Sequence, residues 1–197
     1  MQEIPRNAIP VENGNSFGEF RQASHGQVFF GNDARWPSIP IRSPRVTMLS
    51  SETFLQTIDA TPLVAIDLII PNEHGAYLLG HRVNKPAQGF WFVPGGRIRK
   101  NERLDDAFQR IARDELGHSA VERIDADLLG VYEHLYEDNF SGQAGISTHY
   151  VVLGYRLRRP VELDNLPNAQ HTAYRWATRE EIVADSSVHL NTRAYFG

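Results

Sequence analysis

The residues best suited to do chemistry lie in the stretch FVPGGRIRKNERLDDAFQRIARDELG, residues 92–117. Within it, Leu104, Phe108 and Ile111 recur at helical spacing and predict one buried stripe. Glu115 follows Leu104 by eleven positions, which puts it about 20° from that stripe. A buried carboxylate is costly without a charged partner, and no Lys or Arg stands one turn earlier on this face. A divalent cation with oxygen ligands is the natural partner, and the alternative is a helix-end acid that simply reaches solvent.

The sequence also marks the ends of this helix. Asn101 is expected to cap its N-terminus, where Glu102 and Asp105 would place negative charge at the positive end of the helix dipole. Gly117 predicts a left-handed stop. Because Glu102 lies about 140° from Glu115 around the helix, we expect Glu102 to be structural and to pair with a base.

The elements that must position this helix are strands and further helices. Residues 62–71, PLVAIDLIIP, form a nearly continuous apolar run of the length expected for a strand buried on both faces. A short helix would begin at Ser50 or Ser51, and a closing helix would begin at a capping box of Thr178 and Glu181. The other predicted strands are residues 75–83, 90–96, 126–136, 147–159 and 173–178. This mix favours the α/β class, with a mixed β-sheet sandwiched between α-helices.

Composition limits the classes of protein. A chain of 197 residues with 41% hydrophobic content can bury one core, so one domain with a tail is expected. The formal net charge of −4 gives no basic footprint for nucleic acid or a membrane surface. No apolar run approaches the roughly 18 residues of a membrane span, and the N-terminus lacks a signal-peptide core. The absence of cysteine excludes disulfides and thiolate metal sites. These features favour a cytoplasmic protein.

Residues 1–47 differ from the rest of the chain. They contain five of the eleven prolines and keep no helical or strand period, so we predict a flexible N-terminal extension. Met48, the only methionine after Met1, stands where patterned sequence begins. Either translation starts at Met48 and the extension is not part of the native protein, or the extension is a genuine arm. The patterned domain is expected to span residues 48–197.

The helix and the turn before it resemble the Nudix box, usually written G-x5-E-x7-R-E-U-x-E-E-x-G-U with U an aliphatic residue. The matching residues span 22 positions and are Gly96, Glu102, Arg110, Glu115 and Gly117. The chain departs from the box where two glutamates and the closing aliphatic residue are replaced by Ile111, Asp114 and His118. The resemblance implies a Nudix hydrolase in which the usual cluster of metal-binding glutamates is reduced essentially to one.

Other segments resemble the GDP-mannose mannosyl hydrolase branch of that family. They include TPLVAIDLII, RVNKPAQGFWFVPGGR, THYVVLGYR and NTRAYF, and the similarity runs from about Met48 to Phe196. The resemblance implies a Nudix fold and magnesium-dependent hydrolysis of GDP-mannose, or a related GDP-hexose, to GDP and free sugar. Water would attack the sugar C1 from the side opposite the departing GDP, with inversion.

The same resemblance implies a metal site with one Mg²⁺ per subunit, for which Mn²⁺ can substitute. Its ligands would be the backbone carbonyl of Gly95, the carboxylate of Glu115 and the side chain of Gln170, completed by the substrate phosphates. His171 matches the general base of the family, and a neutral imidazole can take a proton from water near pH 7. The alternative for Gln170 and His171 is a solvated loop.

The resemblance assigns four more side chains to catalysis. Arg82 and Arg97 match contacts to the diphosphate, for which guanidinium groups offer fixed, forked donors. Tyr150 would donate a further hydrogen bond, and Asp67, an acid inside an apolar run, matches an aspartate near the sugar. The alternatives are surface arginines, a core tyrosine and an aspartate that caps a neighbouring turn.

A third group would bind the base of the nucleotide. Met48, Leu49 and Phe54 match the segment that the family uses around guanine, often across a dimer interface, so a homodimer is implied. The remaining histidines and tryptophans of interest are expected to be structural: His134, His149, His189, Trp91 and Trp176.

Two other functions stay open. The first is a conventional Nudix pyrophosphatase that cleaves a nucleotide sugar at phosphorus, and the losses at Ile111 and Asp114 argue against it. The second is a non-catalytic Nudix sensor that binds a nucleotide sugar, and the retention of Arg82, Gln170 and His171 argues against that. In every case the ligand is a small molecule, a nucleotide sugar.

Overall fold

The computed structural model describes residues 49–117, 121–161, 163, 166–167 and 171–197. By its contacts the chain divides into residues 1–40 and residues 41–197, and every described residue belongs to the second unit. The predicted extension over residues 1–47, together with Met48 and Gln170, lies outside the described residues. Within the described part, no helix combines the length and the apolar character that a membrane span requires.

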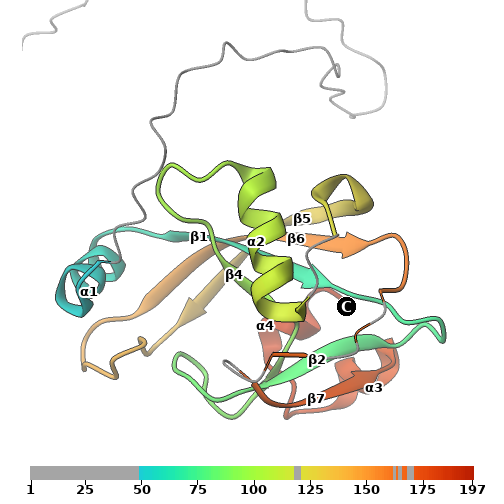
Figure 1. Cartoon of the computed structure of the whole chain (residues 1–197). Coiled ribbons are helices and arrows are strands. Elements are labelled where there is room, and N and C mark those ends of the chain that lie inside the picture. The colour runs from blue at the N-terminus through green and yellow to red at the C-terminus, as the bar shows by residue number, and fades with distance from the viewer. Residues whose placement is uncertain (1–48, 118–120, 162, 164–165, 168–170) are drawn as a thin grey trace, which may run out of the picture. The chain divides into compact units, whose positions relative to one another are not determined.

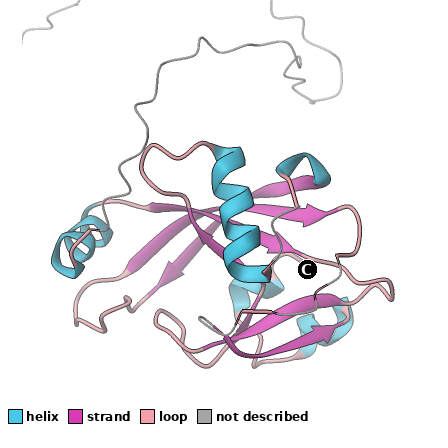
Figure 2. Cartoon of the chain, in the orientation of Figure 1, coloured by secondary structure: helices cyan, strands magenta, loops and turns pink. Residues whose placement is uncertain are grey.

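In the described part of the chain, seven strands form two sheets, and helices lie around them (Figures 1 and 2). Sheet A has the order β4-β1-β6-β5, with β1 and β6 parallel and the other pairs antiparallel. Sheet B is antiparallel and has the order β3-β2-β7. The strands of sheet A are β1 (Leu63–Ile69), β4 (Gly95–Arg97), β5 (Ala126–Tyr136) and β6 (Thr148–Leu157). Those of sheet B are β2 (Tyr77–Arg82), β3 (Trp91–Phe92) and β7 (His171–Ala177). The predicted α/β class is confirmed.

One predicted strand is wrong in its extent. Residues 90–96 were expected to form a single strand, but β3 joins sheet B and β4 joins sheet A. Pro94 stands between them and has no N–H to give to a ladder. Its carbonyl accepts a hydrogen bond from the Leu68 N–H of β1 at 2.8 Å. Pro94 therefore lies where the chain passes from sheet B to sheet A.

The helices begin and end largely where local chemistry directs them. The helices are α1 (Ser51–Ala60), α2 (Leu104–Leu116), the 3-10 turn η1 (Arg123–Asp125), α3 (Arg179–Ala184) and α4 (Leu190–Arg193). Ser50 caps α1 by accepting from the Thr53 N–H at 3.1 Å. Thr178 and Glu181 form the predicted capping box of α3. The short helix α4 was not predicted, and His189 caps it by accepting from the Asn191 N–H at its Nδ1.

The predicted start of α2 is wrong. Asn101 does not cap the helix, because it adopts a left-handed φ of 64° in the preceding turn, and the helix begins at Leu104 after Arg103. Glu102 therefore lies before the helix and not in its first turn. The predicted end is right, since Gly117 has a φ of 68° and its N–H donates to the Arg113 carbonyl.

Helix α2 lies across one face of sheet A (Figure 1). Phe108 and Ile111 of the helix pack in one cluster with Ile66 and Leu68 of β1, which share that face because side chains alternate along a strand. A second cluster joins sheet B to α3 and the C-terminal residues: Ile69, Leu79, Val93, Ala177, Ile182, Val188 and Phe196. The side chain of Asp67 points to the face of β1 opposite α2.

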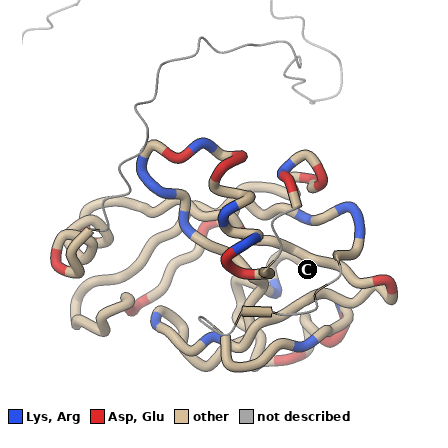
Figure 3. Tube along the Cα trace, in the orientation of Figure 1, with Lys and Arg blue, Asp and Glu red and all other residues tan. Residues whose placement is uncertain are grey.

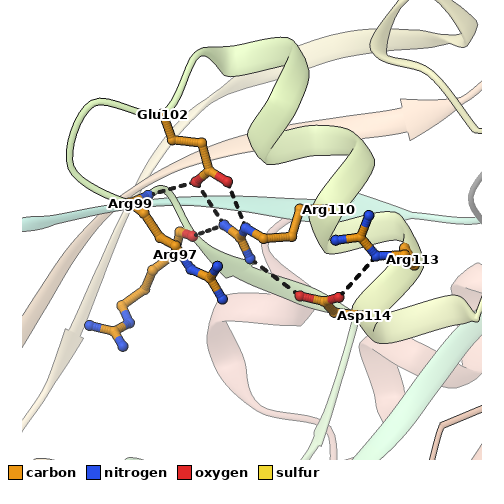
Figure 4. A network of polar contacts seen from close by, with 6 residues as sticks. All are labelled: Arg97, Arg99, Glu102, Arg110, Arg113 and Asp114. Carbon is orange, nitrogen blue, oxygen red and sulfur yellow. Dashed lines mark hydrogen bonds and ion pairs between the residues drawn. The ribbon is translucent and has the colours of Figure 1, made fainter. Parts of the chain in front are cut away.

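A network of ion pairs and hydrogen bonds fastens the N-terminal half of α2 to the loop that follows β4 (Figure 4). Arg110 donates to both carboxylate oxygens of Glu102, at 2.6 and 2.9 Å, and to the carbonyl of Arg97 at 2.7 Å. Glu102 also accepts from the Arg99 N–H at 2.8 Å. Glu102 is thus structural and paired with a base, as predicted. Figure 3 shows acidic and basic residues interspersed along this loop and α2.

Removal of the Arg110 side chain should destabilise the protein. Arg110→Ala removes the side-chain donor of Glu102 and of the Arg97 carbonyl, in a region where both ion-pair side chains are only 12–13% exposed. Hydrogen bonds to charged groups contribute about 1.5–3 kcal/mol each, so thermal denaturation should show a Tm several degrees lower. Arg113→Ala is the matched control, because the Arg113–Asp114 pair is exposed and such pairs contribute little. Equal losses in the two variants would contradict this role for Arg110.

Candidate functional site

The register of sheet A gathers several predicted site residues on the face away from α2. Asp67 on β1 pairs with Gly95 on β4 and Gly154 on β6, and Arg97 pairs with Ala65. Tyr150 pairs with Leu63 in the same way. Directly paired residues project to the same face, so Asp67, Arg97 and Tyr150 share one surface.

Asp67 is held inside this surface. The Tyr195 hydroxyl donates to its Oδ2 at 2.7 Å. Burial raises the pKa of Asp67 to about 7, while Tyr195 and the positive charge of Arg82 lower it and the negative charge of Glu115 raises it further. The turn-capping alternative is not what the structure shows, because the side chain is hydrogen-bonded to Tyr195, 128 positions away.

Gly95 leaves room for that carboxylate. A Cβ at this position would overlap Oδ1 of Asp67 and lie 2.8 Å from the Ile66 carbonyl oxygen. The backbone of β4 therefore approaches Asp67 more closely than any residue with a side chain allows, and glycine is required here for space.

Glu115 and His171 form the second part of the site. Glu115 is 3% exposed and His171 is 5% exposed, so both polar side chains are buried. His171 Nε2 lies 3.4 Å from Glu115 Oε2. The periodicity that put Glu115 on the buried face of α2 is confirmed, and His171 is the first residue of β7 and not part of a solvated loop.

Sheet B supports the imidazole. His171 pairs with Arg82 across β7 and β2, and its ring lies over Gly80. A Cβ at Gly80 would come within 2.5 Å of His171 Nδ1, so this glycine makes the space for the ring. The two predicted catalytic side chains Arg82 and His171 are consequently fixed by neighbouring strands.

The two arginines lie against aromatic rings. Arg82 has its guanidinium carbon 5.3 Å from the centre of the Phe92 ring, and its Nε donates to the Asn84 carbonyl at 3.1 Å. Arg97 is exposed, and its guanidinium carbon lies 3.9 Å from the centre of the Phe54 ring. Stacking on a ring fixes the plane of a guanidinium while leaving its N–H donors available.

Tyr150 lies close enough to Arg97 and Arg82 for their charges to affect its pKa. Burial raises the pKa of Tyr150, and the nearby charges of Arg97 and Arg82 lower it. Its ring centre is 6.1 Å from that of Tyr136. The hydroxyl therefore stays protonated at neutral pH and can donate a hydrogen bond to an anion.

Of the residues predicted around guanine, Phe54 and Leu49 are described, and Phe54 contacts another predicted site residue. Phe54 contacts Arg97 and packs at 5.0 Å from the Phe140 ring. Leu49 is 51% exposed.

Two of the predicted metal ligands, Gly95 and Glu115, are among the described residues. A buried carboxylate and a backbone carbonyl are oxygen donors of the type that Mg²⁺ prefers. Among the residues with described positions, no group of three or more His, Cys, Asp and Glu side chains could hold a metal. A site with Glu115 as its one carboxylate fits a single hard cation that takes its other ligands from backbone, amide and substrate oxygens.

Two residues that sequence reasoning missed complete this wall of the site. Tyr195 contacts Asp67, and its hydroxyl also lies 3.2 Å from Nε2 of His134, which we had expected to be structural. Alternation along β5 would have put His134 on the same face as Tyr132 and Tyr136 once the register was known. Nothing in the sequence links Tyr195 to Asp67.

Comparisons with known proteins agree with this architecture. A family model described as "NUDIX domain" matches residues 61–195. The low-salt glycan biosynthesis protein Agl8 of Haloferax volcanii is 40% identical over 128 residues, which cover 64% of this chain and 77% of that protein.

Two solved structures show the same fold. The MutT protein from Methanosarcina mazei Go1 has a TM-score of 0.56 and 21% identity, covering 70% of this chain and 92% of that one. The MutT NUDIX hydrolase from Burkholderia pseudomallei has a TM-score of 0.54 and 23% identity, covering 69% and 96%.

The raised pKa of Asp67 predicts how stability depends on pH. Because the folded protein holds this proton up to about pH 7, against an ordinary pKa of 3.8, the stability from protonated Asp67 is lost as pH rises between these values. The Asp67→Asn variant cannot ionise at this position. The Tm of the variant minus that of the wild type, measured in metal-free buffer, should therefore be about 5 °C larger at pH 8 than at pH 5. A Tm difference that stays constant over this range would contradict the assignment.

Proposed function

The chain belongs to the Nudix family, and on that premise we propose that it hydrolyses GDP-mannose, or a related GDP-hexose, to GDP and free sugar. Nudix hydrolases act on nucleoside diphosphate derivatives and generally use divalent metal ions. The finer assignment is that water attacks C1 of the sugar, with inversion, and that the diphosphate is released intact.

The observation that carries this proposal concerns the two positions of the Nudix box where glutamate is replaced, residues 111 and 114. Ile111 is 1% exposed and belongs to the apolar core, and a Cβ at Gly96 would meet its Cγ1 at 3.1 Å. Asp114 lies in ion pairs with Arg110 at 3.6 Å and Arg113 at 3.5 Å (Figure 4). Neither residue contributes a carboxylate beside Glu115. A cluster of several metals that activates water against phosphorus therefore lacks its ligands, and this favours attack at carbon.

The metal would be one Mg²⁺ or Mn²⁺ per subunit, held by the Gly95 carbonyl, Glu115 and Gln170. When bound, such a cation offsets negative charge on the substrate diphosphate and on the departing GDP.

Three side chains of the protein would bind the diphosphate beside the metal. Arg82 and Arg97 would bind the diphosphate with forked N–H donors and stabilise the charge that develops as the sugar carbon separates from GDP. Tyr150 would donate a further hydrogen bond to the same oxygens. Both guanidinium groups lie against aromatic rings, a position that leaves N–H donors available for the diphosphate.

His171 would take the proton of the attacking water on its imidazole. Its Nε2 lies 3.4 Å from Oε2 of Glu115, so the base stands beside the residue proposed to bind the metal. Because the water reaches C1 from the side opposite GDP, the product sugar has the inverted configuration. Asp67 would lie near the sugar, on the face shared with Arg97.

The nucleotide base would lie over α1. Phe54 offers an aromatic surface next to Arg97 and Phe140, and Met48 and Leu49 would complete the contacts to guanine in a homodimer. The name of the relative from Haloferax volcanii refers to glycan biosynthesis. Glycans are assembled from activated sugars, so this likeness supports a nucleotide sugar as the substrate.

Replacement of the buried glutamate should remove most of the turnover that depends on magnesium. Glu115→Gln keeps the shape of the side chain but removes the charge, so most magnesium-dependent turnover should be lost while the fold is retained. Asp114→Asn is the matched control, since Asp114 is paired outside the site and its loss should leave kcat within a few-fold of wild type. If Asp114→Asn were as damaging as Glu115→Gln, a carboxylate cluster at phosphorus would be the better account.

The isotope experiment separates attack at carbon from attack at phosphorus. In H₂¹⁸O, hydrolysis of GDP-mannose at C1 puts the label on the released mannose and leaves GDP unlabelled, which mass spectrometry of both products detects. A label in a phosphate group, or release of GMP and a hexose 1-phosphate, would reject the proposed reaction and favour a conventional Nudix pyrophosphatase. Binding without turnover would favour the sensor.

A further inference from the structure

We propose that Tyr195 is a positioning residue of this site, whose hydroxyl fixes the orientation of both Asp67 and His134. The proposal rests on the proposed function for its kinetic consequence, because Asp67 is there placed near the sugar. Its structural content does not depend on the reaction, since the contacts among the three side chains belong to the folded chain.

When Asp67 is ionised, the three polar groups can be satisfied in one order. A tyrosine hydroxyl has a single hydrogen to donate, and the Tyr195 hydroxyl lies 2.7 Å from Asp67 Oδ2 and 3.2 Å from His134 Nε2. When that hydrogen goes to the carboxylate, His134 must present an N–H from Nε2 to the hydroxyl oxygen. Burial lowers the pKa of His134 to about 4, so its ring is neutral and has one N–H to place.

The tyrosine ring is itself fixed. A Cβ at Gly154 would lie 3.0 Å from Tyr195 Cε1 and 3.0 Å from Tyr132 Cε2, so the bare glycine provides the space into which both rings pack. The two rings meet at 4.6 Å between centres in an edge-to-face arrangement. Phe196, the next residue, is buried in the cluster beneath sheet B and anchors the chain end.

The two oxygens of Asp67 therefore have different surroundings. Oδ2 accepts from Tyr195, whereas Oδ1 is packed against the bare backbone of Gly95. Without the hydroxyl, rotation of the carboxylate would no longer be restricted on the Oδ2 side. A misplaced group near the reacting carbon affects the transition state more than ground-state binding, and the diphosphate contacts of Arg82 and Arg97 would be unchanged.

Kinetics of Tyr195→Phe on GDP-mannose test the catalytic consequence. The ring and its packing on Gly154 are kept, so kcat should fall about 10–100-fold while KM changes less than about 3-fold. Tyr132→Phe is the matched control, since it removes a hydroxyl from the ring packed beside Tyr195, and it should keep near-normal kcat. A normal kcat in Tyr195→Phe would overturn the proposal, as would equal losses in the two variants.

A double-mutant cycle asks whether Tyr195 acts through Asp67. In the Asp67→Asn background, Tyr195→Phe should cost much less than it does in the wild type. An undiminished cost would mean that Tyr195 does not act through the carboxylate.

NMR of the histidine ring gives a readout that needs no turnover. At a pH well above 7, where Asp67 is ionised, the ¹⁵N shifts of His134 should report the neutral Nε2–H form in the wild type and a mixture of the two neutral forms in Tyr195→Phe. Identical shifts in the two proteins would overturn the proposal. If the shifts change as expected but GDP-mannose is not hydrolysed at carbon, the network stands and the proposed function fails.

Discussion

The burial of the Glu115 carboxylate is the constraint on which the rest of the structure depends. A carboxylate that is 3% exposed is costly in an apolar setting, and its neighbours include a second acid, Asp67, whose charge it opposes. The imidazole of His171 at 3.4 Å offsets part of this cost. In the proposed function, a cation bound by Glu115 would offset negative charge at the same place.

The scaffold is organised to keep that carboxylate in place. The ion pair of Glu102 and Arg110 fastens the first half of α2 to the loop after β4, and Gly117 ends the helix two residues beyond Glu115. The same loop follows Gly95, whose carbonyl is the expected second ligand. One set of hydrogen bonds thus joins the helix that carries the acid to the loop after β4. The network includes the carbonyl of Arg97, whose side chain is proposed to bind the diphosphate.

The positions of residues that depend on local periodicity could be predicted from the sequence. Positions that depend on how distant strands pair could not. Glu115 stood out because the helical period is strict, and Asp67 because it interrupts an apolar run. The start of α2 was misjudged because Glu102 completes a turn with the Arg99 N–H and so ends up outside the helix. The division of residues 90–96 between two sheets, and the meeting of Tyr195, His134 and Asp67, depend on pairings between distant strands that no single segment encodes.

The departure from the Nudix box at Ile111 involves the packing of the core around this residue as well as the residue itself. In the box this position carries a glutamate, but here the side chain lies in the core cluster with Phe108 and Ile66. It also lies against Gly96, where an added Cβ would be 3.1 Å from its Cγ1. A charge at residue 111 would therefore enter the hydrophobic core and not a metal site. Apolar packing thus replaces a carboxylate at residue 111, and of the three glutamates that follow the arginine of the box only Glu115 is retained.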